Sequence, residues 1–221
     1  MLKENIEYIE GLKRFGIKYD LSNMEEICRI LGNPERDFKT VHVGGTNGKG
    51  STSTMIARVL EDGGYKVGLY TSPYVVKYNE RIQINGEMIE DSELDGMINE
   101  LRKVFESEEL MISFFEFTTA LAFVYFSRAR VDVAVIEVGL GGLLDSTNVI
   151  DSEISVITNV ALDHCDYLGN DKMSIAKKKA GIIKKNQVCV TSEKDIEIRE
   201  YFRKVCVENE SRLVYSGNVF A

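Results

Sequence analysis

Short apolar runs rich in valine and isoleucine recur along this 221-residue chain, and the segments between them carry apolar residues at the spacing of a helix. The runs occupy residues 38–43, 66–71, 131–137, 154–158 and 187–191. Runs of this length predict buried strands. Because helical crossovers join strands that run in the same direction, the alternation predicts an α/β fold with a mostly parallel sheet flanked by helices.

Two of the expected helices have a capping-box pattern at their start. Ser22 and Ser113 precede helical patterns over 24–31 and 114–126, and each is followed three residues later by a glutamate. The second of these helices is almost wholly apolar, so we expect it to be buried. The chain has only two prolines and no evident linker or repeat. We therefore expect residues 1–221 to fold as one body.

A glycine-rich turn, GGTNGKGST, begins at Gly44, directly after the first predicted strand and before a helix over 51–62. Glycines at this place let backbone N–H groups close around phosphate oxygens at a helix N-terminus. Lys49 would neutralise the β- and γ-phosphates, and the Ser51 hydroxyl would bind magnesium. Gly50 separates the two, whereas the standard pattern has the hydroxyl directly after the lysine. The order of strand, loop and helix favours an ATP site over a glycine turn with a surface lysine. The residues expected to contact ATP are Gly45, Thr46, Asn47, Gly48, Lys49, Gly50, Ser51 and Thr52.

Two further polar side chains are expected at the edge of the sheet from which this loop departs. Glu137 ends one predicted strand and His164 follows another. The carboxyl ends of parallel strands meet at one edge, where ligands bind. A carboxylate, an imidazole and the Ser51 hydroxyl would thus converge on magnesium. Since hard cations prefer oxygen, a hydrogen-bonded structural role is the alternative for His164 alone.

Charge and cysteine content limit the other classes of function. With 27 Lys and Arg against 35 Asp and Glu, the net charge of −8 gives no electrostatic basis for a broad nucleic-acid surface. No apolar run approaches the roughly 18 residues of a membrane-spanning helix, and the first residues are charged. We expect a cytoplasmic monomer that binds neither nucleic acid nor membrane. Its four cysteines, Cys28, Cys165, Cys189 and Cys206, would stay reduced.

The string HVGGTNGKGST resembles the folylpolyglutamate synthase and dihydrofolate synthase family, relatives of the Mur peptidoglycan ligases. Other blocks resemble that family in the same order: GLKRFGIKYDL, GLYTSPYVVKYNERIQING, FFEFTTALAF, IEVGLGGLLDSTNV, ITNVALDHCDYLG and IAKKKAGIIK. Together they cover residues 8–185. The resemblance implies a P-loop NTPase-like domain of the Mur ligase central type. It also implies an ATP- and magnesium-dependent ligase that adds L-glutamate to a folate or dihydropteroate carboxylate through an acyl phosphate.

The resemblance also assigns a metal-binding and catalytic set. Ser51 and Glu137 would bind one magnesium ion, while Glu137, His164 and Ser72 would bind a second. Lys49 and His164 would act in catalysis together with Lys179.

Lys179 matches the lysine that the family carries as a carbamate. A neutral amine that adds carbon dioxide becomes an anion able to bind a metal. The alternative is solvated helix surface, because Lys177, Lys178, Lys184 and Lys185 surround it. The family often has an acidic residue where Lys178 stands.

By the same resemblance, the residues near the pterin are Phe115, Glu116, Phe117, Thr118, Leu144, Asp145 and Ser146. Aromatic faces and a carboxylate suit a flat, nitrogen-rich heterocycle. A place in the core is the alternative for the two phenylalanines. The family usually has histidine at Tyr74 and arginine at Leu143, so a possible anion contact is missing here.

Family members are about twice as long and have a second α/β domain that completes the nucleotide and glutamate sites. After Tyr215 we find no counterpart of a later H-Q-x-x-N block. We therefore expect an N-terminal ATP-binding domain that is cut short, without the glutamate-side domain. A nucleotide-binding fragment without catalysis, or another P-loop kinase or NTPase, remains an alternative. The blocks around His164 and Lys179 favour the ligase, and the choice between dihydropteroate and tetrahydrofolate stays open.

Overall fold

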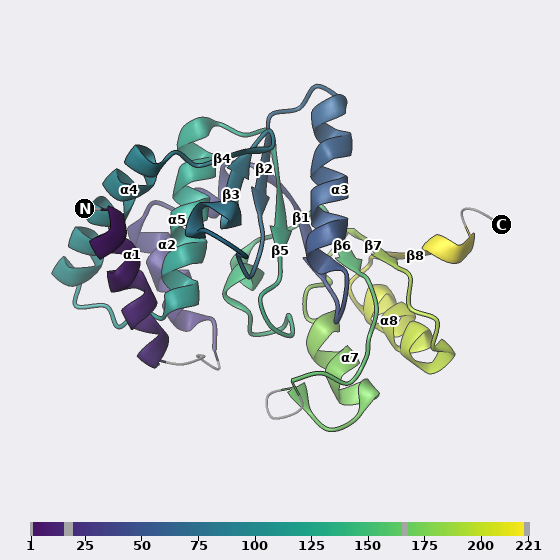
Figure 1. The fold of residues 1–221 in the computed structure, drawn as a ribbon. Coiled ribbons are helices and arrows are strands. Elements are labelled where there is room, and N and C mark those ends of the chain that lie inside the picture. The colour runs from purple at the N-terminus through teal and green to yellow at the C-terminus, as the bar shows by residue number, and fades with distance from the viewer. Residues whose placement is uncertain (1, 16–19, 165–167, 219–221) are drawn as a thin grey trace.

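Strands between residues 39 and 215 form one sheet in the computed structural model (Figure 1), which describes residues 2–15, 20–164 and 168–218. In these residues the strands are β1 Lys39–Gly44, β2 Val67–Tyr70, β3 Ile82–Ile84, β4 Glu87–Met88, β5 Val133–Glu137, β6 Ile154–Ile157, β7 Val188–Thr191 and β8 Arg212–Tyr215. Their spatial order is β4-β3-β2-β5-β1-β6-β7-β8. In this spatial order, every neighbouring pair from β2 to β8 is parallel, whereas β3 pairs antiparallel with both β2 and β4. The predicted α/β fold with a mostly parallel sheet is confirmed.

Helices cover both faces of this sheet. The helices are α1 Leu2–Gly11, α2 Ser22–Ile30, α3 Lys49–Asp62, α4 Asp91–Ser107, α5 Phe114–Ala129, α7 Lys172–Ala180 and α8 Ile196–Glu208. Ala57 of α3 packs on one face, against Val43 and Val135. Successive side chains of a strand point to opposite faces, and the alternating residues Ala134 and Ile136 pack with α5 on the other face. The helices α1, α2 and α4 lie outside α5 and form a further layer (Figure 1).

The helix α5 is buried, as its apolar sequence predicts. Its Phe117, Phe123 and Phe126 are fully enclosed. On β2, a Cβ at Gly68 would lie 2.8 Å from the ring of Phe126, so only glycine lets the helix approach the sheet this closely. Burial of such phenylalanines stabilises the fold by roughly 1.5–3 kcal/mol each.

The two predicted capping boxes have different outcomes. At α5 the box is present, because the Ser113 hydroxyl accepts from the Glu116 N–H and the Glu116 carboxylate accepts from the Ser113 N–H. At α2 the prediction is wrong. Ser22 is already inside the first turn, and Asp20 accepts hydrogen bonds from both its N–H and its hydroxyl. The helix begins at the serine itself, because the aspartate two residues earlier accepts from the exposed Ser22 N–H.

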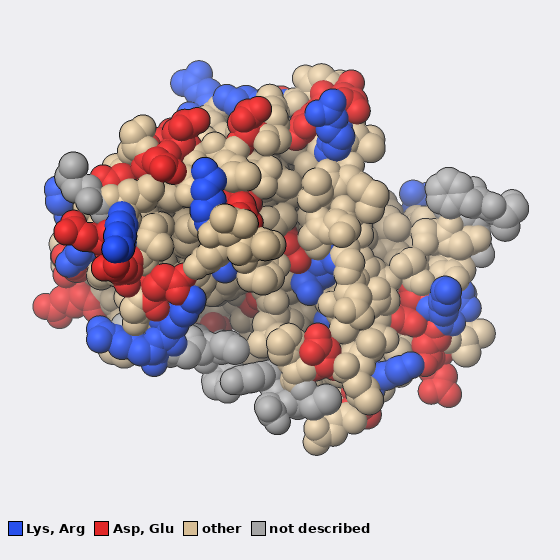
Figure 2. All heavy atoms as spheres, viewed as in Figure 1, with Lys and Arg blue, Asp and Glu red and all other residues tan. Residues whose placement is uncertain are grey.

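Acidic and basic side chains are interspersed over the face seen in Figure 2. Among the described helices, none is long and apolar enough to cross a membrane. Cys28, Cys189 and Cys206 are buried free thiols, whereas Cys165 lies outside the described residues.

Candidate functional site

The glycine-rich loop leaves the carboxyl end of β1 and enters α3. The helix begins at Lys49, two residues earlier than the sequence pattern predicts, with Gly48 as N-cap at φ 79°. Gly45 has φ 141°, and a Cβ there would lie 1.8 Å from the Thr158 hydroxyl oxygen. Both the backbone conformation and the space therefore require glycine. The first-turn N–H groups of α3 and the Lys49 ammonium form a site that favours an anion.

The residues after β6 hold this loop in place. The Asn159 carbonyl accepts from the Thr46 N–H at 2.9 Å, and its side-chain oxygen accepts from the Asn47 N–H at 3.1 Å. The Thr158 hydroxyl donates to the Asn47 carbonyl at 2.8 Å. The N–H groups of Thr46 and Asn47 thus brace the loop against β6. Sequence reasoning missed both bracing residues, because their contacts cross from one strand end to the next.

Glu137 lies at the same edge, because Val43 of β1 is its register partner on β5. It is buried, and its Oε2 accepts from the Ser72 N–H at 2.9 Å. Burial raises the pKa of Glu137, while the Ser72 N–H and the charge of Lys49 oppose the rise. A Cβ at Gly50 would come within 3.3 Å of this carboxylate. Gly50, the residue that interrupts the standard loop pattern, therefore leaves room for Glu137 beside the start of α3.

The other predicted magnesium ligands are Ser51, Ser72 and His164. Ser72 and His164 line one cavity. His164 also lines the phosphate side, which is the small pocket formed by Gly45, Thr46, Lys49 and Lys179. Ser51 is exposed in the first turn of α3. His164 is exposed, with Nε2 at 3.7 Å from Asp163 Oδ2. Within the described ranges, no three His, Cys, Asp or Glu side chains cluster closely enough to hold a metal. The donor set nevertheless fits magnesium, which typically binds one or two carboxylates together with substrate phosphates and water.

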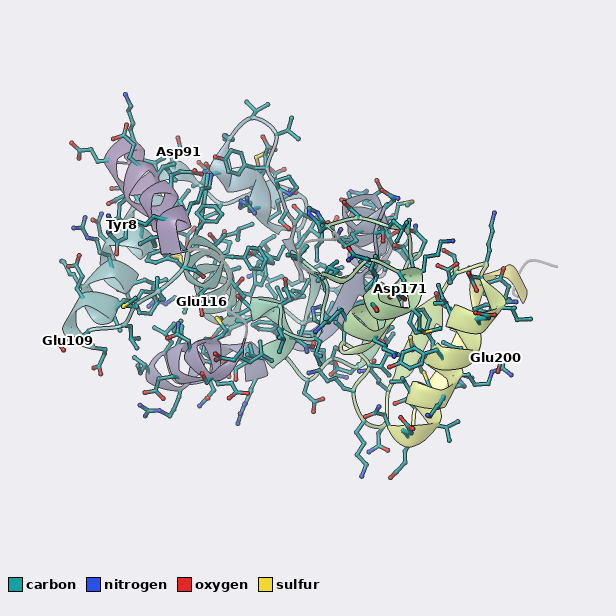
Figure 3. All side chains as sticks on the ribbon, turned by 90° about the horizontal axis from the view of Figure 1, so that it is seen from below. Tyr8, Asp91, Glu109, Glu116, Asp171 and Glu200 are labelled. Carbon is teal, nitrogen blue, oxygen red and sulfur yellow. The ribbon has the colours of Figure 1, made fainter. Side chains whose placement is uncertain are left out.

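Lys179 lies inside the protein, unlike its lysine neighbours. It belongs to α7, whose first turn is capped by Asp171, which accepts from the Ser174 N–H at 2.9 Å; Figure 3 labels Asp171. Only 3% of Lys179 is exposed, and its Nζ donates to the Gly45 carbonyl at 2.8 Å. Burial, and then the charge of Lys49, lower the pKa of Lys179 to about 8. The lysine therefore reaches the phosphate loop rather than solvent.

A cavity of about 380 Å³ adjoins the phosphate side. Four residues predicted near the pterin line it, namely Phe115, Leu144, Asp145 and Ser146. Arg81, which the sequence analysis did not single out within the block YNERIQING, lines it as well. The volume suits a small ligand with one flat ring system.

Phe117 and Thr118 do not line this cavity, and their place near the pterin stays a prediction. Phe117 is fully buried, with its ring edge-on to Tyr8 at 6.1 Å between centroids. The Thr118 hydroxyl donates to the Phe114 carbonyl and accepts from Tyr78. Phe117 lies on the face of α5 that packs against α1 and α4, where its ring meets Tyr8 and Phe105, whereas Thr118 is enclosed beside Tyr78.

Glu116 has a structural role. Its carboxylate accepts from the Ser113 N–H and hydroxyl and from the Asn23 amide at 2.9 Å. In Figure 3 it lies in the same half of the molecule as Tyr8. It caps α5 and joins that helix to α2, and it does not line the cavity.

A buried chain of hydrogen bonds fixes the aspartate of the cavity. His42 Nε2 is 2.8 Å from the Thr147 hydroxyl, which donates to Asp145 Oδ1. Burial lowers the pKa of His42 to about 3, so the ring is neutral. Because the Thr147 hydroxyl donates to Asp145, its oxygen accepts from His42 Nε2. Asp145 Oδ2 accepts from the Leu140 N–H at 2.7 Å. Burial raises the pKa of Asp145, although these hydrogen bonds oppose the rise.

The two positions that depart from the resembled family pattern have different surroundings. Tyr74 donates to Glu10 at 2.8 Å, which ties the loop after β2 to α1. Leu143 is 41% exposed and lies against the backbone of Gly181.

Comparisons with known proteins identify relatives over most of the chain. The family model "Mur ligase middle domain" matches residues 43–218. The folylpolyglutamate synthase of Lacticaseibacillus casei is 46% identical over 193 residues, which are 85% of this chain and 45% of that protein. The dihydrofolate synthase/folylpolyglutamate synthase of Bacillus subtilis is 41% identical over 201 residues, 89% of this chain and 47% of that protein. A solved structure described as an FPGS-AMPPCP-folate complex superposes with a TM-score of 0.93 at 41% identity, over 97% of this chain and 53% of that one. The chain thus spans about half the length of the curated relatives it matches.

Proposed function

The chain belongs to the Mur ligase middle-domain family, and we propose that it is the part of an amide ligase that binds ATP, magnesium and a pterin-linked carboxylate. The complete reaction would add L-glutamate to a folate or dihydropteroate. The observation that carries the proposal is the position of the 380 Å³ cavity beside the phosphate loop. Gly139, Leu140 and His164 line both the cavity and the phosphate side. A carboxylate bound in one would face a phosphate bound in the other.

The chemistry follows from this juxtaposition. An oxygen of the substrate carboxylate attacks the γ-phosphorus of ATP, which forms an acyl phosphate and releases ADP. The amine of L-glutamate then displaces phosphate and forms the amide. Lys49 and the first-turn N–H groups of α3 would bind the β- and γ-phosphates and stabilise the charge of the transferred group.

Magnesium has a suitable set of ligands here. Ser51 and Glu137 would hold one ion, and Glu137, His164 and Ser72 would hold a second. When bound, the metal would neutralise charge on the phosphoryl oxygens. Gly50 leaves the Glu137 carboxylate unobstructed beside the loop.

Lys179 would contribute as a carbamate. Its buried amine has a pKa of about 8, so a neutral fraction is present near neutral pH. The neutral amine adds carbon dioxide and loses one proton, which forms a C–N bond and leaves an anion. An ammonium beside Lys49 and two magnesium ions would be repelled, whereas a carbamate would be attracted.

Calorimetry of this chain with MgATP tests the proposal. We expect binding weaker than roughly 1 µM, since the contacts identified here all involve the phosphates. Lys49→Ala should remove it, because the change deletes the cation that faces the phosphates. The matched control is Lys103→Ala, which removes an exposed lysine from α4. Absence of binding at millimolar MgATP, or equal affinities of wild type and Lys49→Ala, would contradict the proposal.

A further inference from the structure

The guanidinium of Arg81 lies at the cavity wall, and two of its three nitrogens have no hydrogen-bonding partner among the described residues. Arg81 ends the 3₁₀ turn η3, Tyr78–Arg81, and only 6% of the residue is exposed. Its Nε and Nη1 are both buried and unpaired among the described residues. Glu10, the acidic residue that faces Tyr74, accepts from Tyr74 and Lys13 and not from Arg81. The carboxylates of Glu10 and Glu137 act on Arg81 through their charge, so these N–H groups remain available to a ligand that brings an anion.

Aromatic rings hold the guanidinium in a fixed place. Its Cζ lies 5.0 Å from the ring centroid of Tyr74, 5.2 Å from that of Phe114 and 6.0 Å from that of Tyr78. The Arg81 carbonyl accepts from the Thr71 N–H at 3.0 Å, which fixes the backbone to the end of β2. Cation–π contacts use the face of the planar group and leave its N–H edge for other partners.

We propose that Arg81 binds the carboxylate of the pterin-linked substrate through its paired N–H groups; this inference rests on the proposed function. A guanidinium matches a carboxylate in geometry and charge. Asp145, the acidic residue of the same cavity, already accepts from the N–H groups of Leu140 and Thr147. Its charge suits the N–H donors of a heterocycle and would repel a carboxylate. Arg81 thus supplies the guanidinium that the sequence lacks at Leu143.

The test compares two ligands that differ only in charge, pteroate and its uncharged carboxamide. Each is titrated into the wild-type chain and into Arg81→Gln, Arg81→Lys and Lys77→Gln. The last is the matched control, since Lys77 is exposed and belongs to the same segment. Arg81→Gln should weaken pteroate binding by about 10- to 100-fold, which is typical for loss of a hydrogen bond to a charged group. Its effect on the carboxamide should stay under about threefold. Arg81→Lys should lie between the two, and Lys77→Gln should change neither affinity.

The outcomes separate this inference from the proposed function. Equal weakening of both ligands by Arg81→Gln, or no change for either, overturns the carboxylate contact and leaves the pterin site intact. Failure of the wild-type chain to bind either ligand counts against the pterin site itself, and the inference then fails with it. Thermal melting without ligand provides a structural check, because loss of the cation–π contacts alone should lower the melting temperature by no more than about 5 °C. A larger decrease with equal loss of both ligands would make Arg81 a structural residue.

Discussion

Replacement of Lys179 by methionine should stabilise the fold at neutral pH. Burial lowers the pKa of this lysine from its ordinary value of 10.5 to about 8. At roughly 1.4 kcal/mol per pH unit, the difference means that the buried ammonium costs about 3 kcal/mol below pH 8. Loss of the hydrogen bond to the Gly45 carbonyl costs about 1 kcal/mol. Lys179→Met should therefore be more stable than wild type by about 2 kcal/mol at pH 6.5.

The sign of this effect depends on pH. The folded-state pKa lies below the unfolded one, so the unfolded chain binds more protons between pH 8 and 10.5. Stability of the wild type consequently rises with pH across that window, and the penalty is absent above it. The advantage of Lys179→Met should shrink above pH 8, vanish between about pH 9 and 10, and become a deficit of about 1 kcal/mol above 10.5.

Urea unfolding followed by circular dichroism, in buffers free of carbon dioxide, measures this directly. At pH 6.5 the midpoint should increase by about 1 M urea, given the usual slopes for a chain of this size. The control is Lys177→Met, on the exposed side of α7, whose effect should stay within about 0.5 kcal/mol. A Lys179→Met protein that is less stable than wild type at every pH would refute the reasoning, because the ammonium would then contribute to stability.

Three other substitutions test the site, and two of them have a control variant. Gly45→Ala should abolish MgATP binding in calorimetry and lower the unfolding free energy by about 3 kcal/mol, because its Cβ would overlap the Thr158 hydroxyl. The control is Gly64→Ala, since Gly64 also has positive φ but open space around it. This control should lower the unfolding free energy less and leave MgATP binding unchanged. Glu137→Gln should keep the Ser72 contact yet weaken magnesium-dependent nucleotide binding at least about tenfold in titrations with and without the metal; equal affinities would contradict its role. Phe115→Ala should weaken pteroate binding with little loss of stability, because Phe115 lines the cavity. The control Phe117→Ala should lower the unfolding free energy in urea by about 3–5 kcal/mol, because Phe117 is fully buried. Equal effects of the two substitutions on stability would contradict these placements.

Features that depend on local sequence were predictable. The phosphate loop and the position of Glu137 at a strand end follow from the order of elements, because parallel strands bring their carboxyl ends to one edge. The α5 capping box is also local, since its two partners lie within one turn. At α2 the same pattern failed because Asp20 competes with Ser22 for the helix start.

Features that depend on packing between distant elements were not predictable. Phe115 and Phe117 belong to the same block, and only the packing of α5 against α1 decides which of them faces the cavity. No sequence pattern distinguishes Arg81. Its burial beside the rings of Tyr74 and Phe114, and its unpaired N–H groups, follow only from the packing of the folded chain. Lys179 is the one member of its cluster that was singled out, and that choice came from a family resemblance rather than from charge pattern.

The segment after β5 joins the two halves of the site. Gly139 and Leu140 line both the phosphate side and the cavity, so this short stretch of backbone is the partition between them. A Cβ at Gly139 would lie 2.5 Å from the Phe115 ring, and glycine therefore lets the ring pack directly against that partition. The Leu140 N–H, in turn, is held by Asp145. The same contacts that position the aromatic wall and the aspartate would also fix the distance between a carboxylate and a phosphate in the proposed reaction. Because transfer between two ligands depends steeply on their separation, the stiffness of this segment matters to the proposed reaction as much as the groups that touch the ligands.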